Sequence, residues 1–287
     1  MTDTEVTAIL LVSCPDQQGL VARVSDFIFR HRGNVIHADQ HTDQEEGTFL
    51  QRVEFQLDGF TLGRNEIAPA FAPMAEEFGM RWSIRFSDET ARMAIFVSRY
   101  GHCMCDLLAR WRLGELRSAT PLVISNHADL EPVAREFGVD YHCLPISAST
   151  KSEQEEKIAD LLDERQIDVI VLARYMQILS DSFVNRYIHR TINIHHSFLP
   201  AFAGARPYHK AHERGVKIIG ATAHYVTVEL DQGPIIEQDV VRVSHRDTVS
   251  DMIHKGRDLE KVVLARAVHL HLENRVLVYG NKTVVFD

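Results

Sequence analysis

Residues 167–173 read Ile-Asp-Val-Ile-Val-Leu-Ala, an almost continuous apolar run rich in β-branched side chains. Such a run is typical of a strand buried on both faces, as in a parallel sheet. Similar runs occur at residues 94–98, 120–126 and 140–146, and the stretches between them have helical character. Strands that alternate with helices indicate βαβ units, so we expect an α/β domain, Rossmann-like, with a mainly parallel sheet.

The first 86 residues predict a different order of elements. Strands are expected at residues 6–13, 35–42, 48–57 and 80–86, and helices at residues 20–33 and 64–78. This βαββαβ order is that of the ferredoxin-like fold. Pro69 and Pro73 should weaken or kink the second helix. We therefore expect a domain at residues 1–86, a polar linker at 87–93 and a second domain at 94–287.

The composition is that of a globular protein. Of the 287 residues, 45% are hydrophobic and 25% are charged, which excludes disordered and fibrous classes. The formal net charge of −9 argues against nucleic acid or an anionic membrane as a partner. No apolar run is long enough to cross a bilayer, and residues 1–19 lack the basic start of a signal peptide. Four cysteines in a chain of this length build no disulfide framework, so we expect a reducing, cytoplasmic environment.

Several common catalytic motifs are missing from the sequence. The stretch after the expected strand at 94–98 contains a single glycine instead of a dinucleotide-binding G-x-G-x-x-G. The chain also has no P-loop, no H-E-x-x-H and no G-x-S-x-G. These absences argue against nicotinamide-dependent dehydrogenases, P-loop kinases, zinc proteases of that class and α/β-hydrolases.

The most informative stretch is residues 191–204, TINIHHSFLPAFAG. Asn193 and His195 are two apart in an expected strand, so their side chains point to the same face. Asp231 lies in a turn, ELDQGP, before another expected strand. An amide donor, an imidazole and a carboxylate together suit the attack of water or an amine on an acyl carbon. The spacing alone also allows a plain structural role for each of them, such as a core histidine or a turn aspartate.

The N-terminal module resembles the ACT family in residues 11–22, LVSCPDQQGLVA, and in the pair Gly33-Asn34. The resemblance implies amino-acid binding near the first strand–helix turn, with Asp16, Gly19 and Asn34 as candidate contacts. It implies methionine and glycine as opposing effectors. It also implies pairing of sheets between subunits, hence a homo-oligomer, a dimer or larger. A module that only supports assembly and binds nothing is the alternative.

Three sequence blocks between Asn193 and Gln238 resemble the folate-dependent formyltransferase family: N-I-H-x-S-x-L-P-x-F-x-G, G-x-T-x-H-x-V and L-D-x-G-P-I-I-x-Q. The resemblance implies that Asn193, His195 and Asp231 are catalytic and that a formyl folate is the substrate. It implies no cofactor beyond that folate and no metal, because the formyl group is already activated. The implied folate-binding residues are Met176, Gln177, Ile178, Leu179, His224, Thr227, Val228, Glu229 and Leu230.

The order of the two modules resembles the branch of this family that hydrolyses 10-formyltetrahydrofolate to tetrahydrofolate and formate. That resemblance implies formate supply for purine biosynthesis and balance of the one-carbon folate pools. Residues 99–103 depart from the phosphate-holding turn of the ribonucleotide transferases, and His196 replaces a proline frequent in the family. Both departures fit a second substrate no larger than water. The alternatives are formyl transfer to an amine such as glycinamide ribonucleotide, and a regulator that binds without turnover. Arg174 and Arg206 are candidates for contacts to the anionic glutamate tail.

Overall fold

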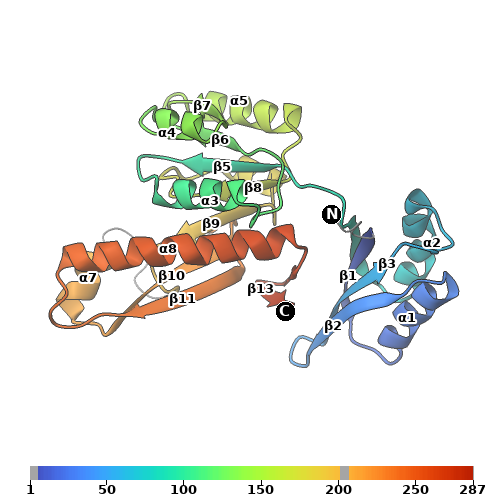
Figure 1. The fold of residues 1–287 in the computed structure, drawn as a ribbon. Helices are drawn as coiled ribbons and strands as arrows, with labels where there is room; N and C mark the ends of the chain where they lie inside the picture. The colour runs from blue at the N-terminus through green and yellow to red at the C-terminus, as the bar shows by residue number, and fades with distance from the viewer. Residues whose placement is uncertain (1–5, 201–206, 287) are drawn as a thin grey trace. The chain divides into compact units, whose positions relative to one another are not determined.

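The computed structural model of the chain describes residues 6–200 and 207–286. They fall into two compact units (Figure 1). The first unit runs to Thr90 and also includes Asn274–Tyr279 and the residues from Thr283 onward; the second comprises Ala91–Glu273 and Gly280–Lys282. Among the described residues, no helix has the length and apolar character needed to cross a membrane.

The first unit has the predicted ferredoxin-like order of elements. Its elements are β1 (Thr7–Pro15), α1 (Leu20–Arg30), β2 (Val35–Asp43), β3 (Thr48–Gln56), α2 (Arg64–Glu77) and β4 (Arg81–Phe86). The strands form one antiparallel sheet in the order β2-β3-β1-β4. Helix α2 runs through both Pro69 and Pro73 as one element, so the prolines do not divide it.

Both faces of β1 are buried, because different elements cover them. Alternate residues such as Leu10 and Val12 pack with α1 and α2 in one core. On the other face, Leu11 packs with Tyr279 and Phe286 from the end of the chain. This end forms a hairpin of β12 (Val276–Tyr279) and β13 (Lys282–Val285).

The predicted extent of the second domain, 94–287, differs from this grouping. The stretches 274–279 and 283–287 belong to the first unit. The physical reason is the hydrophobic effect, because the hairpin covers a sheet face that would otherwise expose Leu11 and Leu50 to water. The boundary between the two units falls between Thr90 and Ala91, within the expected linker at 87–93.

The second unit contains a seven-stranded sheet in the order β11-β10-β9-β8-β5-β6-β7. The strands are β5 (Met93–Val97), β6 (Leu122–Ser125), β7 (Asp140–Cys143), β8 (Val169–Leu172), β9 (Thr191–His195), β10 (Ile218–Tyr225) and β11 (Ile235–Arg242). The helices are α3 (His102–Arg112), α4 (Glu131–Glu136), α5 (Lys151–Glu164), α6 (Asp181–Arg186), α7 (Pro207–Arg214) and α8 (Val249–Leu272). Pairs from β7 to β9 are parallel, whereas β10 pairs antiparallel with both β9 and β11, so the expectation of a mainly parallel sheet is confirmed.

The sheet register brings separate sequence blocks together. Strand β9 pairs with β8 on one side and with β10 on the other. In the β9–β10 pair, His195 lies opposite Thr222 and Asn193 lies opposite His224. The second and first motif blocks are therefore neighbouring strands, and the loop that follows β8 ends beside them. Ligands of parallel sheets bind at such strand ends.

Candidate active site

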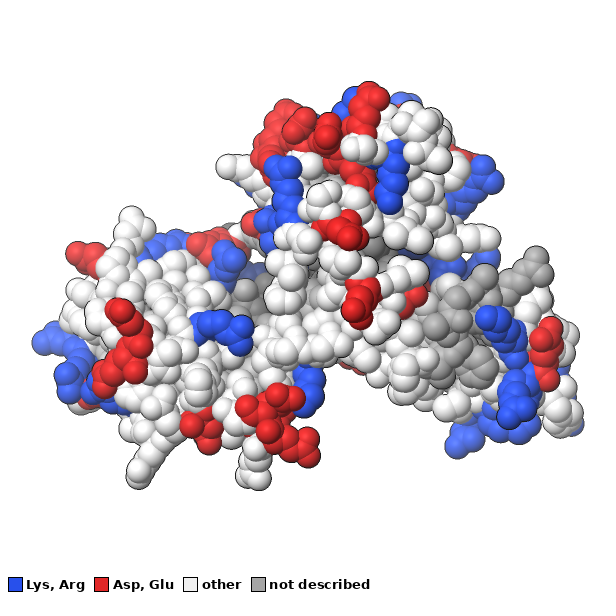
Figure 2. Space-filling view, turned by 180° about the vertical axis from the view of Figure 1, so that it is seen from behind, with Lys and Arg blue, Asp and Glu red and all other residues white. Residues whose placement is uncertain are grey.

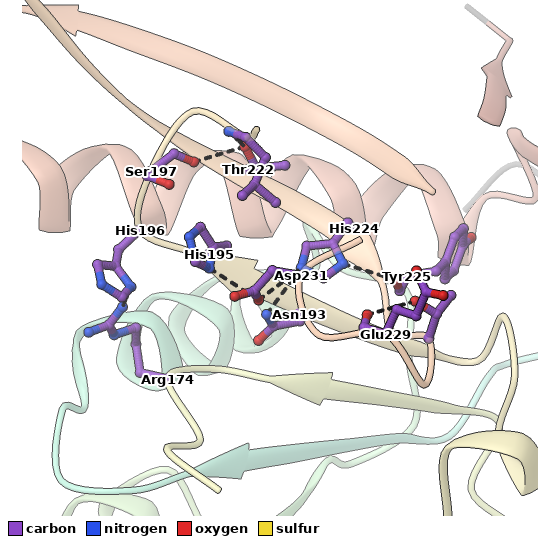
Figure 3. A network of polar contacts seen from close by, with 12 residues as sticks. Arg174, Asn193, His195, His196, Ser197, Thr222, His224, Tyr225, Glu229 and Asp231 are labelled. Carbon is purple, nitrogen blue, oxygen red and sulfur yellow. Dashed lines mark hydrogen bonds and ion pairs between the residues drawn. The ribbon is translucent and has the colours of Figure 1, made fainter. Parts of the chain in front are cut away.

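Asn193, His195 and Asp231 meet at one place (Figure 3). His195 Nδ1 lies 3.2 Å from Asp231 Oδ1, the distance of a hydrogen-bonded ion pair. His195 is buried with 6% of its surface exposed, and its Nε2 has no hydrogen-bond partner among the described residues. A buried ring nitrogen without a protein partner is costly unless it serves a bound group. His195 is therefore oriented by the carboxylate and has one nitrogen available for chemistry.

His224 orients the amide of Asn193. The Nδ1 of His224 lies 2.9 Å from the carbonyl oxygen of Tyr225, which can only accept, so Nδ1 carries a proton. The Nε2 of His224 lies 3.2 Å from Asn193 Nδ2, within hydrogen-bonding distance. Within the described ranges 6–200 and 207–286, the Asn193 amide makes no other side-chain hydrogen bond, so it can donate to a bound group. The same His224 Nε2 is 3.8 Å from Asp231 Oδ1, so His224 lies next to both Asn193 and Asp231.

The loop that carries Asp231 is held in an unusual conformation. Asp231 has a φ of 57°, in the left-handed region that few residues other than glycine, asparagine and aspartate adopt readily. A Cβ on Gly233 would lie 1.8 Å from the carbonyl oxygen of Tyr225, so the loop closes onto β10 only with glycine there. The hydrogen bond from His195, and secondarily the His224 ring, hold the pKa of Asp231 well below its ordinary value. Asp231 is thus an ionised carboxylate at neutral pH.

Two motif residues hold the loop that follows His195. Thr222 Oγ1 donates to the Ser197 carbonyl at 2.9 Å and accepts from the Leu199 amide at 3.1 Å. Gln238 Nε2 donates to Thr222 Oγ1 at 2.9 Å and to the Leu199 carbonyl at 3.1 Å. The threonine and glutamine of the second and third sequence blocks therefore position the first block, a role that the sequence did not reveal.

The three groups face a cavity of about 330 Å³. Its wall includes large apolar side chains that are exposed to solvent: Met176 is 55% exposed, Ile178 65% and Leu230 62%. Exposed apolar side chains that gather around one cavity indicate a ligand site, because water contact with them is unfavourable. The arrangement suits a flat, half-apolar ligand whose reactive end reaches the polar group.

The predicted folate residues occupy the cavity wall with one exception. The cavity is lined by Met176, Gln177, Ile178, Leu179, His224, Thr227, Val228 and Leu230. Glu229 is absent from this lining; its carbonyl accepts a hydrogen bond from Thr227 Oγ1 at 3.0 Å and so shapes the loop. The sequence alone does not show which residue of an irregular loop, such as Glu229, turns its side chain away from the cavity.

Arg174 lines the cavity, but its guanidinium is mostly buried and contacts groups inside the protein. Its side chain is 12% exposed, and Nη1 lies 2.6 Å from Nδ1 of His196. Its Nε is 3.6 Å from a carboxylate oxygen of Glu260, on α8. Sequence reasoning missed Glu260, because nothing local distinguishes it from the solvent-facing acids of a long helix. The other candidate for the tail, Arg206, lies outside the described residues.

Glu260 also belongs to a group of possible metal ligands. Ligand atoms of His102, Cys103 and Glu260 lie within 4.8 Å of one another. The Glu260 oxygens, however, already bind His102 Nε2 at 2.8 Å and the Tyr208 hydroxyl at 2.8 Å. The nearby guanidinium of Arg174 repels a cation. This donor set therefore fits an internal hydrogen-bond network better than a metal ion.

The three candidate effector contacts of the first unit do not lie together. The amide of Asp16 donates to the Gly47 carbonyl at 2.8 Å, and Gly19 precedes α1 with a φ of 93°. Asn34 donates to Gln56 at 2.6 Å, at the far end of β3 from Gly47. A cavity of about 200 Å³ opens on the Asp16 side, and its lining residues are Ser13, Cys14, Pro15, Glu46, Gly47, Thr48, Gly79 and Arg81.

Comparison with known sequences gives a consistent result. Residues 91–268 match the family described as formyl transferase. The formyltetrahydrofolate deformylase of Synechocystis sp. is 61% identical over 281 residues, which cover 98% of this chain and 99% of that protein. The formyltetrahydrofolate deformylase of Escherichia coli K12 is 42% identical over 279 residues, or 96% of this chain and 97% of that protein.

Solved structures resemble the whole chain or a large part of it. A formyltetrahydrofolate deformylase from Pseudomonas syringae pv. tomato aligns with a TM-score of 0.97 and 49% identity, covering 100% of this chain and 96% of that chain. A glycinamide ribonucleotide transformylase from Symbiobacterium toebii aligns with a TM-score of 0.65 and 31% identity, covering 70% of this chain and 97% of that chain.

Proposed function

Because the chain belongs to the formyl transferase family and, within it, to the formyltetrahydrofolate deformylases, we propose that it hydrolyses 10-formyltetrahydrofolate to tetrahydrofolate and formate. The observation that carries the proposal is the cavity in which Asn193, His195 and Asp231 meet under a wall of exposed apolar side chains. An enzyme that hydrolyses an amide-like formyl group needs a proton acceptor, an oxyanion donor and a site for the folate, and this cavity supplies all three.

The apolar wall binds the pterin ring. Met176 and Ile178 follow β8, and Leu230 lies on the loop opposite, so a flat ring fits between two apolar surfaces. Desolvation of these exposed side chains contributes roughly 25 cal/mol for each Å² of apolar surface covered. The formyl group then lies at the polar end of the cavity beside His195.

The chemical step is attack of water on the formyl carbon. Asp231, ionised and hydrogen-bonded to His195, accepts a proton from the water either directly or through that imidazole. The amide of Asn193 and the protonated His195 donate to the developing oxyanion, where each donor is worth about 2.7–4 kcal/mol of barrier. The new C–O bond forms, the bond from the formyl carbon to N10 breaks, and N10 takes the transferred proton. Formate leaves as the anion and releases the second proton to water.

The direct test is formate release from 10-formyltetrahydrofolate by the purified chain, measured with and without glycinamide ribonucleotide as an acceptor. Formate at the same rate in both reactions supports hydrolysis. Formylglycinamide ribonucleotide formed in place of formate would instead indicate a transferase. Ligand binding without either product would indicate a regulator.

We also propose that the first unit senses an amino acid, with methionine and glycine as the effectors to test. The cavity beside Asp16 carries a carboxylate from Glu46 and a guanidinium from Arg81, the charges that pair with the ammonium and carboxylate of an amino acid. Binding measured by calorimetry, and its loss in Arg81→Ala, tests this site. Sheet pairing through the first unit of two copies would give a homo-oligomer, which sedimentation measures.

The cellular setting follows from the same chemistry. We propose a reducing cytoplasm, since all four cysteines are free thiols and two of them are buried. In that compartment, the released formate would serve purine synthesis and folate balance. Acidic and basic side chains are interspersed among the described residues on the face in Figure 2, which does not favour a nucleic-acid partner there. We propose that no metal takes part, so activity should persist in a chelator.

A further inference from the structure

A buried polar chain adjoins His195 on the side away from Asp231. Figure 3 shows His196 and Arg174 on one side of His195 and Asp231 on the other. The rings of His195 and His196 are stacked, with 5.1 Å between centroids and 26° between planes. Both histidines line the same cavity. The His196 ring therefore lies beside His195 in the wall of the cavity.

Glu260 anchors this chain. Its side chain is 2% exposed, and its two oxygens bind His102 and Tyr208 at 2.8 Å each. Burial alone raises the pKa of Glu260, but the hydrogen bond from His102 and the charge of Arg174 outweigh burial and lower it. The ionised carboxylate balances the buried guanidinium, which is 3.6 Å away, so Arg174 can stay charged next to two histidines.

Arg174 fixes the tautomer of His196. A guanidinium only donates hydrogen bonds, so His196 Nδ1, at 2.6 Å from Arg174 Nη1, must carry the lone pair. Burial, and then the charge of Arg174, lower the pKa of His196 to about 4, so the ring is neutral at pH 7. A neutral ring with a free lone pair on Nδ1 holds its proton on Nε2. His196 thus presents a fixed N–H donor, in contrast to His195, which changes its protonation during the reaction.

Residues 99–103 and His196, the two departures from the transferase pattern, both connect to this row of buried polar side chains. Residues 99–103 contribute His102, which binds Glu260 directly. His196 reaches the same carboxylate through Arg174. Two positions that are far apart in the sequence are therefore coupled through one buried acid. Of these residues, Arg174 and His196 line the same cavity as His195 and Asp231.

We propose that His196 is a further catalytic residue, whose Nε2–H binds the oxygen of the attacking water and so selects water over an amine. The proposal rests on the hydrolytic function proposed above. The water donates one proton toward Asp231 and His195 and accepts the hydrogen bond from His196, which aims its second lone pair at the formyl carbon. Arg174, Glu260 and His102 are positioning residues, because they act only through the orientation and tautomer of His196.

The test compares two substitutions at His196. His196→Phe keeps a ring for stacking on His195 but removes the N–H, and we expect kcat for formate release to fall roughly 10- to 100-fold with little change in KM. His196→Gln places an amide N–H near the position of Nε2 and should recover most of this loss. His245→Phe, at an exposed histidine, is the matched control and should leave kcat unchanged.

A competing nucleophile separates water binding from a structural role. With hydroxylamine present, we expect His196→Phe to raise the ratio of formohydroxamate to formate about tenfold over the wild type, because only water depends on the N–H donor. Equal losses in the Phe and Gln variants with an unchanged product ratio would overturn the proposal. So would a His196→Phe variant that keeps the wild-type kcat.

A second variant, Glu260→Gln, tests the proposal even if His196→Phe folds poorly. Glu260→Gln keeps the shape of the side chain but removes the charge that balances Arg174, and it should shift the product ratio in the same direction by a smaller factor. If His196→Phe does not fold, an unchanged ratio in folded Glu260→Gln counts against the proposal. A wild-type chain that releases no formate would refute the proposed function itself, so the two failures remain distinguishable.

Discussion

Replacing Asp231 by asparagine removes one charge from the centre of the site and almost nothing else. The carboxylate lies 3.2 Å from His195 Nδ1 and is 19% exposed, so its charge is only partly screened. Asparagine keeps the size and the left-handed backbone of residue 231, which it adopts about as readily as aspartate. The proton acceptor and the partner of the protonated His195 are both lost. General acid–base catalysis contributes roughly 10²- to 10⁴-fold, so we expect kcat to fall by that factor.

This loss corresponds to about 2.7–5.4 kcal/mol of barrier, at about 1.36 kcal/mol for each tenfold change. KM should change little, because the apolar wall that we propose for the pterin remains intact and the lost interaction belongs to the transition state. Initial rates of formate release, at substrate concentrations that span KM, measure both parameters. Asp160→Asn on the exposed face of α5 is the matched control and should behave as the wild type. Full formate release by Asp231→Asn would refute the assignment of the carboxylate.

Four other outcomes are expected. Asn193→Ala should lower kcat about 10²- to 10³-fold by removing an oxyanion donor, and a loss confined to KM would contradict this role. Leu230→Asp should raise the KM for the folate more than it lowers kcat, whereas the same change at the exposed Leu113 outside the cavity should not. Gly256→Ala should lower the melting temperature, although alanine favours helices, because the new Cβ would lie 2.0 Å from the Tyr208 hydroxyl. The lowered pKa of Asp231 makes its carboxylate stabilising above the unfolded pKa of about 3.9, and this contribution is lost as the pH falls further. The difference in the free energy of unfolding between the wild type and Asp231→Asn, from urea titrations, should therefore be constant from about pH 5 to 7 and shrink below about pH 4.

The sequence carried most of the fold because the signals for these elements are local. The apolar run at 167–173 predicts β8, and the alternation around it predicts the parallel part of the sheet. The same is true of the βαββαβ order in the first unit. The end of the chain was harder to place. Residues 276–285 predict short strands, but nothing in them shows that their apolar side chains cover a sheet formed by the first 86 residues.

The site was predictable to the extent that its residues share a strand or a motif. Asn193 and His195 alternate on β9, so their common face follows from period two. Their meeting with Asp231 depends on a loop that closes only because Gly233 permits it. The inward direction of Arg174 could not be predicted, since it depends on Glu260 from a helix distant in sequence. Long-range pairs of this kind are a property of the folded chain.

The C-terminal hairpin gives the first unit a discontinuous sequence. One face of the sheet that begins at β1 is covered by Tyr279 and Phe286, which follow the seven-stranded sheet in the sequence. During synthesis, the first unit therefore stays incomplete until the second unit has been made. A chain cut before β12 would leave Leu11 and Leu50 on an uncovered apolar sheet face, which is prone to aggregation.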